Sequence, residues 1–327
     1  MANASQIKAL IKSHAEGDNE RFMAVALQMA AHAARTGHTK LAQELRDLID
    51  QSQAKLSSAS AAPARPIAID QPRGDLAGLL AVSYPKTRHS GMALAADVAA
   101  QLDRVVLEHW QRERIREHGY YPARRLLLVG PPGTGKTSTA AALAGELSLP
   151  LFTIQLDGLI SKYLGETAAK LRLIFDAIKQ TRGVYLFDEF DALGGERAAK
   201  GEVGEIRRVL NSFLQFLELD ESDSLVICAT NFPEMLDHAL FRRFDAVIEY
   251  RLPSESLIRQ IMRNRLSPLD TSEVDWDAAV AAARELSHAD VAWACDRAAK
   301  DAILAQRKVA HTEDVVSALG ARRGCRV

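Results

Sequence analysis

The chain has 327 residues, and its formal net charge is −1 because 41 lysine and arginine residues nearly balance 42 aspartate and glutamate residues. This balance gives no electrostatic reason to expect a nucleic acid or an anionic membrane as partner. The three cysteines, Cys228, Cys295 and Cys325, lack the spacing of a metal site, no apolar run approaches the roughly 20 residues that cross a bilayer, and the N-terminus has no signal-peptide pattern, so we expect a cytoplasmic protein without membrane insertion.

The first segments of the chain have the periodicity of amphipathic helices. In one of them Val25 and Met29 lie four positions apart, which places both side chains on the same helical face. We predict a small antiparallel helical bundle over residues 1–56, in which this apolar stripe forms the bundle's own core rather than an exposed groove, and we expect the module to recruit a protein partner. The helical segments lie near residues 4–15, 19–35 and 39–55.

A linker is predicted to follow the bundle. Residues 57–65 are rich in serine, alanine and proline, a composition typical of flexible connections, and we assign the whole of residues 57–95 to this linker. Residues 98–118 then have the pattern of one amphipathic helix that packs on a core. Its arginines and glutamates are typical of a solvated face rather than of a nucleic-acid surface.

A glycine-rich loop joins an apolar run to a helical segment near the middle of the chain. It reads Gly-Pro-Pro-Gly-Thr-Gly-Lys-Thr over residues 130–137 and follows the apolar residues 126–129. Glycines let such a loop aim consecutive N–H groups at phosphates, while the lysine reaches the β- and γ-phosphates and the threonine hydroxyl binds Mg²⁺. We therefore predict an ATP site rather than a glycine-rich turn that holds a lysine by chance. Its nucleotide-binding residues are Gly130, Pro131, Pro132, Gly133, Thr134, Gly135, Lys136, Thr137, Ser138 and Asp188.

Two carboxylates end a later apolar run. Asp188 and Glu189 directly follow residues 184–187, which have the pattern of a buried strand. Side chains at the carboxyl end of a parallel strand project into the cleft beyond the sheet. We expect Asp188, together with Thr137, to hold Mg²⁺, and Glu189 to activate the water that attacks the γ-phosphate. The alternative is a solvated acidic strand end without a role in chemistry.

An amide and a pair of arginines complete the pattern. Asn231 follows the apolar residues 225–229, where its amide can hold the attacking water or touch the γ-phosphate, and Arg242 and Arg243 come after it. The glycine-rich loop, the carboxylates, the amide and the arginine pair stand in the order found in AAA ATPases. Over roughly residues 96–320 the chain resembles this family, and within it most resembles the branch that holds katanin, spastin and the ATPase that disassembles ESCRT polymers.

The resemblance implies a ring of subunits. Paired arginines in this family lie at a subunit boundary and reach the γ-phosphate that the neighbour binds. It therefore assigns Arg242 and Arg243 to catalysis across the interface of a homo-hexamer, with an ordinary basic surface as the alternative. It also implies that Lys162, Tyr163 and Leu164 line a central pore, where an aromatic ring grips a polypeptide without reading its sequence. The alternative for Tyr163 is packing under a loop.

Apolar runs alternate with helical patterns in the second half of the chain, which is the signature of a parallel sheet wrapped by helices. We predict an α/β fold with a five-stranded parallel sheet of P-loop type in an ATPase subdomain over residues 96–252. The predicted strands lie at residues 125–129, 151–155, 184–187, 225–229 and 246–250.

Helical patterns alone follow Pro253, so we predict a helical lid and tail over residues 253–327. One turn of this lid reads Ser-His-Ala-Asp at residues 287–290, where related ATPases have Ser-Gly-Ala-Asp. A side chain thus replaces a glycine that lets backbone approach the nucleotide closely. The sequence leaves open whether His288 touches the nucleotide or points outward.

The resemblance implies an ATP- and Mg²⁺-dependent ring ATPase that remodels, unfolds or disassembles a protein recruited by the N-terminal bundle. One alternative is an ATPase that regulates a separate effector enzyme, such as a protease or a defence protein. Another is a nucleic-acid remodeller, which would show DNA-stimulated hydrolysis with steep salt dependence. The near-neutral charge and the lack of a recognisable DNA-binding motif argue against the latter.

Overall fold

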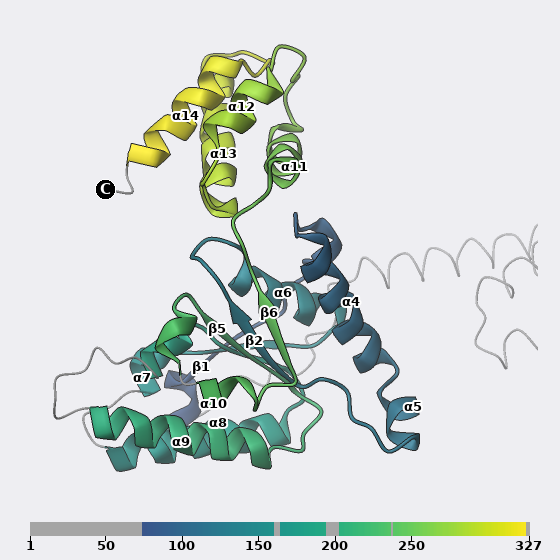
Figure 1. Cartoon of the computed structure of the whole chain (residues 1–327), viewed down its shortest axis with the longest axis vertical. Helices are drawn as coiled ribbons and strands as arrows, with labels where there is room; N and C mark the ends of the chain where they lie inside the picture. Colours follow the sequence, from purple (N-terminus) through teal and green to yellow (C-terminus); the bar gives the residue numbers. More distant parts are fainter. Residues whose placement is uncertain (1–73, 160–163, 194–202, 237, 325–327) are drawn as a thin grey trace, which may run out of the picture. The chain divides into compact units, whose positions relative to one another are not determined.

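The computed structural model describes residues 74–159, 164–193, 203–236 and 238–324 (Figure 1). The predicted N-terminal bundle, residues 1–56, and the predicted pore-loop residues Lys162 and Tyr163 lie outside the described residues, as does the side chain of Leu164. Within the described part, no helix combines the length and the apolar character needed to cross a membrane.

A six-stranded sheet forms the centre of the fold, in the strand order β1-β3-β4-β5-β2-β6. All neighbouring strands are parallel except β1, which runs antiparallel to β3 at one edge. The five predicted strands are confirmed and the α/β class with them. The strand bounds are β1 Leu80–Ser83, β2 Arg125–Val129, β3 Leu151–Ile154, β4 Val184–Phe187, β5 Leu225–Thr230 and β6 Ala246–Glu249.

The edge strand β1 corrects the linker prediction. The sequence predicts a linker over residues 57–95, yet Leu80 pairs with Ile154 and Ser83 pairs with Leu151 in the sheet. Leu79 and Leu80 are buried in the core, and a short 3-10 helix, Gly74–Gly78, precedes them. The described part of the predicted linker therefore belongs to the ATPase core, because two buried leucines and a ladder of backbone hydrogen bonds hold it there.

Helices cover both faces of the sheet (Figure 1). The strand side chains alternate between the two faces, because neighbouring strand residues belong to different core clusters. Leu127, Tyr185 and Phe187 pack with helices α8 (Leu164–Gln180) and α9 (Val203–Leu219) in one core cluster. The residues in between, such as Leu126, Leu128 and Leu186, pack with α4 (Ala96–Trp110) and α6 (Lys136–Glu146) in the other. Both faces are buried, which explains why these strands read as unbroken apolar runs.

The predicted helix over residues 98–118 is two helices. Helix α4 ends at Trp110, and after Gln111, whose φ is −99° and ψ 19°, the short helix α5 (Arg112–Glu117) begins. Two other short helices are α7 (Leu156–Leu159) and α10 (His238–Phe241), and the remaining 3-10 turns are His89–Gly91, Phe190–Leu193 and Pro233–Met235.

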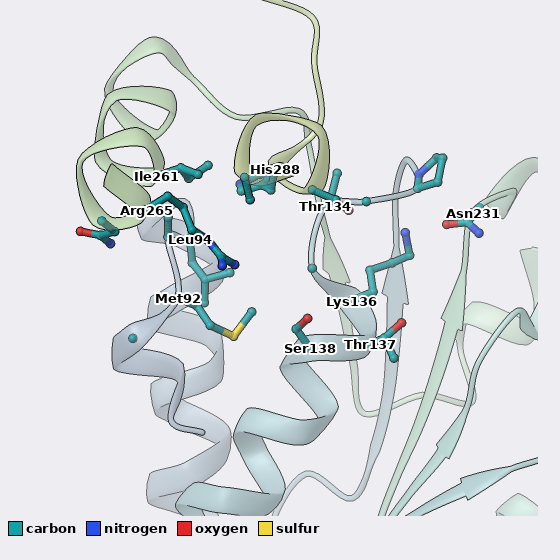
Figure 2. Close-up of a pocket in the computed structure, with 18 of the residues that line it drawn as sticks. Met92, Leu94, Thr134, Lys136, Thr137, Ser138, Asn231, Ile261, Arg265 and His288 are labelled. Atoms are coloured by element: carbon teal, nitrogen blue, oxygen red, sulfur yellow. The ribbon is translucent and has the colours of Figure 1, made fainter. Parts of the chain in front are cut away.

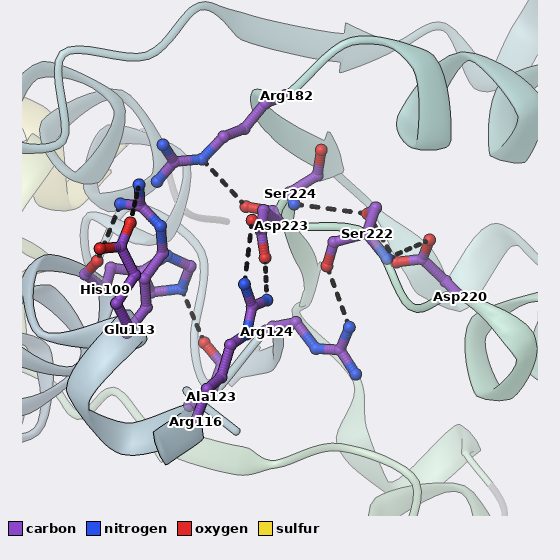
Figure 3. A network of polar contacts seen from close by, with 11 residues as sticks. His109, Glu113, Arg116, Ala123, Arg124, Arg182, Asp220, Ser222, Asp223 and Ser224 are labelled. Atoms are coloured by element: carbon purple, nitrogen blue, oxygen red, sulfur yellow. Dashed lines mark hydrogen bonds and ion pairs between the residues drawn. The ribbon is translucent and has the colours of Figure 1, made fainter. Parts of the chain in front are cut away.

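A network of polar contacts ties α4 and α5 to the edge of the sheet where the strands begin (Figure 3). Arg116 of α5 pairs with Asp223, which precedes β5. The backbone carbonyl of Asp223 accepts a hydrogen bond from Arg182 Nε at 3.3 Å, and Arg182 precedes β4. His109 of α4 donates from Nε2 to the Ala123 carbonyl at 2.8 Å. This network lies where the strands begin. The candidate site lies at the other end of the sheet, where the strands end.

The C-terminal helices form a separate small bundle, as predicted for a lid (Figure 1). Its core is made of residues such as Ile258, Met262, Val291 and Val315, all buried. Polar side chains cap three of the four helices at their N-termini: Ser254, Asp275 and Ser287 each accept a hydrogen bond from the first turn. The four helices are α11 (Glu255–Leu266), α12 (Trp276–Ala282), α13 (His288–Leu304) and α14 (Thr312–Gly324).

Candidate active site

A pocket of about 500 Å³ lies where β2, β4 and β5 end and the lid begins (Figure 2). The glycine-rich loop forms one wall, and Asp188, Glu189 and Asn231 belong to the same pocket. Thus the structure brings together most of the residues that the sequence predicts for nucleotide, metal and water, while Gly130 and Pro131 do not line the pocket. The lid and the segment before α4 add lining residues that the sequence analysis did not predict: Met92, Leu94, Ile261, Asn264, Arg265 and Ala292.

The glycine-rich loop needs glycine at two positions, because the backbone is left-handed there and other atoms approach closely. Gly130 has a φ of 142°, and a Cβ there would lie 2.2 Å from the carbonyl oxygen of Tyr250. Gly133 has a φ of 74°, and its Cβ would lie 2.5 Å from Ser287 Oγ in the lid. Both the backbone conformation and the close approach exclude larger residues. The loop therefore packs tightly against β6 on one side and the lid on the other.

Lys136 begins helix α6 and folds back over the loop. Its Nζ donates to the carbonyl oxygens of Gly130 at 2.7 Å and Pro131 at 2.8 Å, and the side chain is buried. Burial lowers the pKa of the Lys136 ammonium, while the charges of Asp188 and Asp191 oppose this shift. A phosphate oxygen gives the ammonium a charge-assisted partner stronger than a carbonyl. The position suits a lysine that binds an anion at the helix N-terminus.

Thr137 and Asp188 form a pair suited to a hard cation. The Thr137 hydroxyl donates to Asp188 Oδ2 at 2.6 Å, and Asp188 Oδ1 accepts from the Glu189 backbone N–H at 3.0 Å. Among the described residues, no group of three or more His, Cys, Asp or Glu side chains gathers as a metal site. A hydroxyl and a carboxylate oxygen are nevertheless ligands that Mg²⁺ accepts when substrate phosphates and waters complete its octahedron. The donor set therefore fits Mg²⁺ delivered with a nucleotide.

Glu189 and Asn231 lie at the ends of β4 and β5. Glu189 is exposed, and its φ of 51° is in the left-handed region, uncommon for a residue with a side chain. Before Asn231, the Thr230 hydroxyl donates to Asp191 Oδ1 at 2.9 Å and accepts from the Phe232 N–H at 3.0 Å. These bonds hold the turn that presents Asn231, on the same side of the pocket as Lys136 (Figure 2). Asp191 is a supporting residue that the sequence analysis missed.

The lid touches the glycine-rich loop directly. The Ala289 N–H donates to the Gly133 carbonyl at 3.0 Å. Ser287 and Asp290 form a reciprocal capping box at the start of α13, which fixes this turn. His288, between them, lines the pocket and lies between Arg265 and the loop (Figure 2). The question that the sequence left open is thus answered: the side chain lies against the pocket.

The structure does not bring the arginine pair to this pocket. Arg242 and Arg243 follow α10 and are absent from the pocket lining. Arg243 Nε pairs with Glu218 Oε1 of α9 at 3.1 Å, and Arg242 is exposed. Within one chain, therefore, these arginines cannot serve the pocket that Lys136 and Asp188 line.

Comparison with known proteins shows which protein family this chain resembles in sequence. Residues 126–252 match the family model described as the ATPase family associated with various cellular activities (AAA). The chain is 34% identical over 321 residues to the uncharacterized AAA family ATPase y4kL of Sinorhizobium fredii, covering 98% of this chain and 95% of that protein. It is 36% identical over 217 residues to a probable 26S proteasome regulatory subunit 10B of Caenorhabditis elegans, covering 63% of this chain and 53% of that one. It is 35% identical over 251 residues to an ATP-dependent zinc metalloprotease FtsH of Acidothermus cellulolyticus, covering 73% of this chain but 37% of that one.

Proposed function

Because the chain belongs to the AAA family of ATPases and is an ATP hydrolase, we propose that it works as a Mg²⁺-dependent ring ATPase that remodels or unfolds a protein substrate. The observation that carries the proposal is a pocket in which Lys136, the Thr137–Asp188 pair and Asn231 meet under a lid that is bonded to the loop. This is the arrangement that phosphoryl transfer needs: an anion cradle, a metal position and a polar group near the end of the phosphate chain.

Each side chain has a distinct role in this proposal. Lys136 moves from the loop carbonyls to the β- and γ-phosphates, and Thr137, supported by Asp188, holds Mg²⁺. Mg²⁺ bound there would neutralise the charge that develops on the phosphate oxygens. Glu189 accepts a proton from the attacking water, and Asn231 orients that water or contacts the γ-phosphate. The carboxylate of Glu189 suits this because it is exposed beside the pocket.

Hydrolysis then requires a second protomer. Arg242 is exposed and lies outside its own pocket, so its guanidinium is free to approach the nucleotide of a neighbour in a homo-hexamer. An arginine supplied in trans raises the rate by about 10³ to 10⁵ in comparable enzymes. Arg243, held by Glu218, supports the loop from within its own protomer and completes the pair at the interface.

A protein is the substrate class that the relatives support. Their names describe a proteasome regulatory subunit and a metalloprotease, both of which act with proteins. In this proposal the protein is most similar to the branch of katanin and spastin and works in the cytoplasm. Its ring grips the substrate with Lys162, Tyr163 and Leu164, and residues 1–56 recruit that substrate. The division into bundle, large subdomain and lid belongs to the same proposal, with the linker limited to residues before Gly74.

A second candidate is a ring that serves a separate protease or other effector. It is favoured by one observation: a relative that is 35% identical over 73% of this chain is named an ATP-dependent zinc metalloprotease, a name that joins an ATPase to a protease. In this candidate the pocket residues keep their roles. Only the use of ATP hydrolysis differs, because the ring delivers substrate to an enzyme on another chain or activates that enzyme.

The test is affinity capture on the full chain carrying Glu189→Gln, which binds ATP but does not hydrolyse it. Three further baits carry, in addition, a deletion of residues 1–56, Tyr163→Ala, or Tyr120→Ala as a matched tyrosine control, since Tyr120 is 71% exposed. A threaded substrate is captured by the parent and the Tyr120→Ala bait and lost from the other two. A stoichiometric enzyme retained by Tyr163→Ala would favour the second candidate. DNA-dependent capture would contradict both.

A further inference from the structure

His288 is held rigidly at the border between the lid and the glycine-rich loop. It is the first residue of α13, and the Ser287–Asp290 capping box fixes the turn before it. The next residue, Ala289, donates to Gly133 at 3.0 Å. The His288 side chain lines the main pocket and also an adjoining pocket of about 440 Å³, with Leu94 and Thr134 shared between the two. The backbone that carries His288 is therefore fixed, and its ring borders both pockets.

The main pocket has two chemically different ends. Lys136, Thr137 and Asn231 stand at one end, which is the phosphate end by the roles proposed above (Figure 2). Met92, Leu94 and Ile261 supply an apolar lining at the other (Figure 2). A purine has apolar faces and polar edges, so it fits the apolar end and needs few, well-placed hydrogen bonds there. His288 lies on the side of this end, near Ile261 and Arg265 (Figure 2).

The protonation state of His288 follows from its surroundings. Burial lowers the pKa of the imidazole, so the ring is neutral at pH 7. The charged groups that face the two pockets are Lys136, Asp188, Glu189 and Arg265 on one side and Asp97, Glu249 and Arg251 on the other. Burial, rather than any of these charges, is the cause of the lowered pKa.

The orientation of the ring selects one tautomer. Nδ1 is buried and has no hydrogen-bond partner among the described residues. A buried N–H without an acceptor costs free energy, so the single proton of the neutral ring belongs on Nε2. Because Nδ1 is turned away from solvent while the ring lines the pocket, the edge that carries Nε2 is the one a ligand can reach. His288 thus offers a donor where the two pockets adjoin, beside the apolar end of the main pocket.

We propose that the Nε2–H of His288 donates a hydrogen bond to a ring nitrogen of the bound purine, which makes His288 a residue that selects the nucleobase. This inference rests on the proposed binding of ATP in the main pocket. Purine N1, N3 and N7 are the acceptors that can receive such a bond in adenine. The contact is a property of this chain, because a glycine at this position would have no side-chain donor to offer.

The experiment measures Kd for ATP and for 1-deaza-, 3-deaza- and 7-deaza-ATP, each of which lacks one ring acceptor. The proteins are the full chain and its His288→Ala, His288→Gln and His311→Ala variants; His311 is a lid histidine that lines neither pocket. We expect one deaza analogue to bind the parent about threefold to tenfold more weakly than ATP, as expected for one hydrogen bond. This ratio should fall to about 1 in His288→Ala, persist in His311→Ala, and survive in part in His288→Gln, which keeps an N–H donor.

The possible outcomes distinguish a failure of the His288 contact from a failure of the proposed ATP binding. Equal deaza ratios in the parent and in His288→Ala would overturn the contact, even if ATP binds tightly to both. A ratio that changes with 2′-deoxy-ATP instead of the deaza series would place His288 on the sugar and also overturn it. If the parent bound no ATP at all, the proposed function itself would fail.

Discussion

The side-chain oxygens of Thr139 and Tyr250 lie 2.6 Å apart in a buried hydrogen bond between helix α6 and the end of β6. The Thr139 hydroxyl also donates to the Gly135 carbonyl at 3.0 Å, so the Tyr250 hydroxyl is the donor between the two. Burial raises the pKa of Tyr250 to about 12, which keeps that hydroxyl protonated. Tyr250 also donates its N–H to Val129, directly before Gly130. One residue thus fastens both ends of the glycine-rich loop to the strand that leads into the lid.

Removing this bond should cost stability. Tyr250→Phe leaves the ring packed but deletes the donor, and Thr139→Val deletes the acceptor together with the Thr139 bond to the Gly135 carbonyl. We expect each to lower the free energy of unfolding by about 0.5–1.5 kcal/mol, measured by urea denaturation. Because both changes remove the same bond, their effects should not add in the double variant. Fully additive losses would show that the two hydroxyls act independently.

Replacing the proposed base should separate binding from hydrolysis. Glu189→Gln keeps the size of the side chain and removes its capacity to accept a proton. We expect turnover to fall by about 10²- to 10⁴-fold, the usual contribution of a general base. The Kd for ATP should stay within about twofold, because the carboxylate bonds neither Lys136 nor Thr137 among the contacts described. A variant that loses ATP binding as strongly as turnover would assign Glu189 to the nucleotide instead.

The Thr137–Asp188 pair makes magnesium dependence testable. Asp188→Asn keeps an oxygen near the Thr137 hydroxyl but removes the charge that supports a cation. We expect the Mg²⁺ concentration for half-maximal turnover to rise by about 10- to 100-fold, a range typical of residues that support a metal ligand. Removing the metal with EDTA should abolish hydrolysis in the parent. Unchanged magnesium dependence in the variant would exclude Asp188 from the metal site.

His109 should make the fold sensitive to mild acid. Burial lowers the pKa of this imidazole below its ordinary value of 6.5, partly offset by its bond to the Ala123 carbonyl. Between the folded and unfolded pKa values the unfolded chain binds more protons, so stability falls as the pH falls below about 6.5. His109→Gln keeps an N–H for Ala123 and cannot be protonated. Its unfolding free energy should therefore change less between pH 7 and about 5 than that of the parent; an identical pH slope would contradict this.

Most of the site was predictable because its chemistry is local in sequence. The glycine-rich loop, Asp188–Glu189 and Asn231 each stand directly after an apolar run, and parallel strands bring such positions to one edge. The lid lining was not predictable in this way. Helical periodicity identifies which face of α11 is apolar, but Ile261 and Arg265 meet the pocket only because of how the lid packs on the loop.

The features of the fold that the sequence failed to predict have physical causes as well. Strand β1 has only four residues, Leu-Ala-Val-Ser, and its place at the sheet edge depends on pairing with β3 rather than on a pattern of its own. The break between α4 and α5 falls at Gln111, where neither proline nor glycine marks it. Instead, the Arg116–Asp223 pair draws α5 toward the sheet, a contact 107 positions apart in sequence. Long-range contacts of this kind leave no local signal.

The central claim is that hydrolysis takes place between protomers, and a mixing experiment tests it most directly. Arg242→Ala keeps an intact pocket but lacks the arginine for its neighbour, while Glu189→Gln supplies the arginine but cannot hydrolyse ATP; each alone should be nearly inactive. Turnover is measured for each variant and for their equimolar mixture at the same total concentration. We predict that the mixture regains at least about tenfold more activity than the sum of its parts, because mixed rings pair an intact pocket with an intact arginine. A mixture no more active than that sum would contradict catalysis in trans.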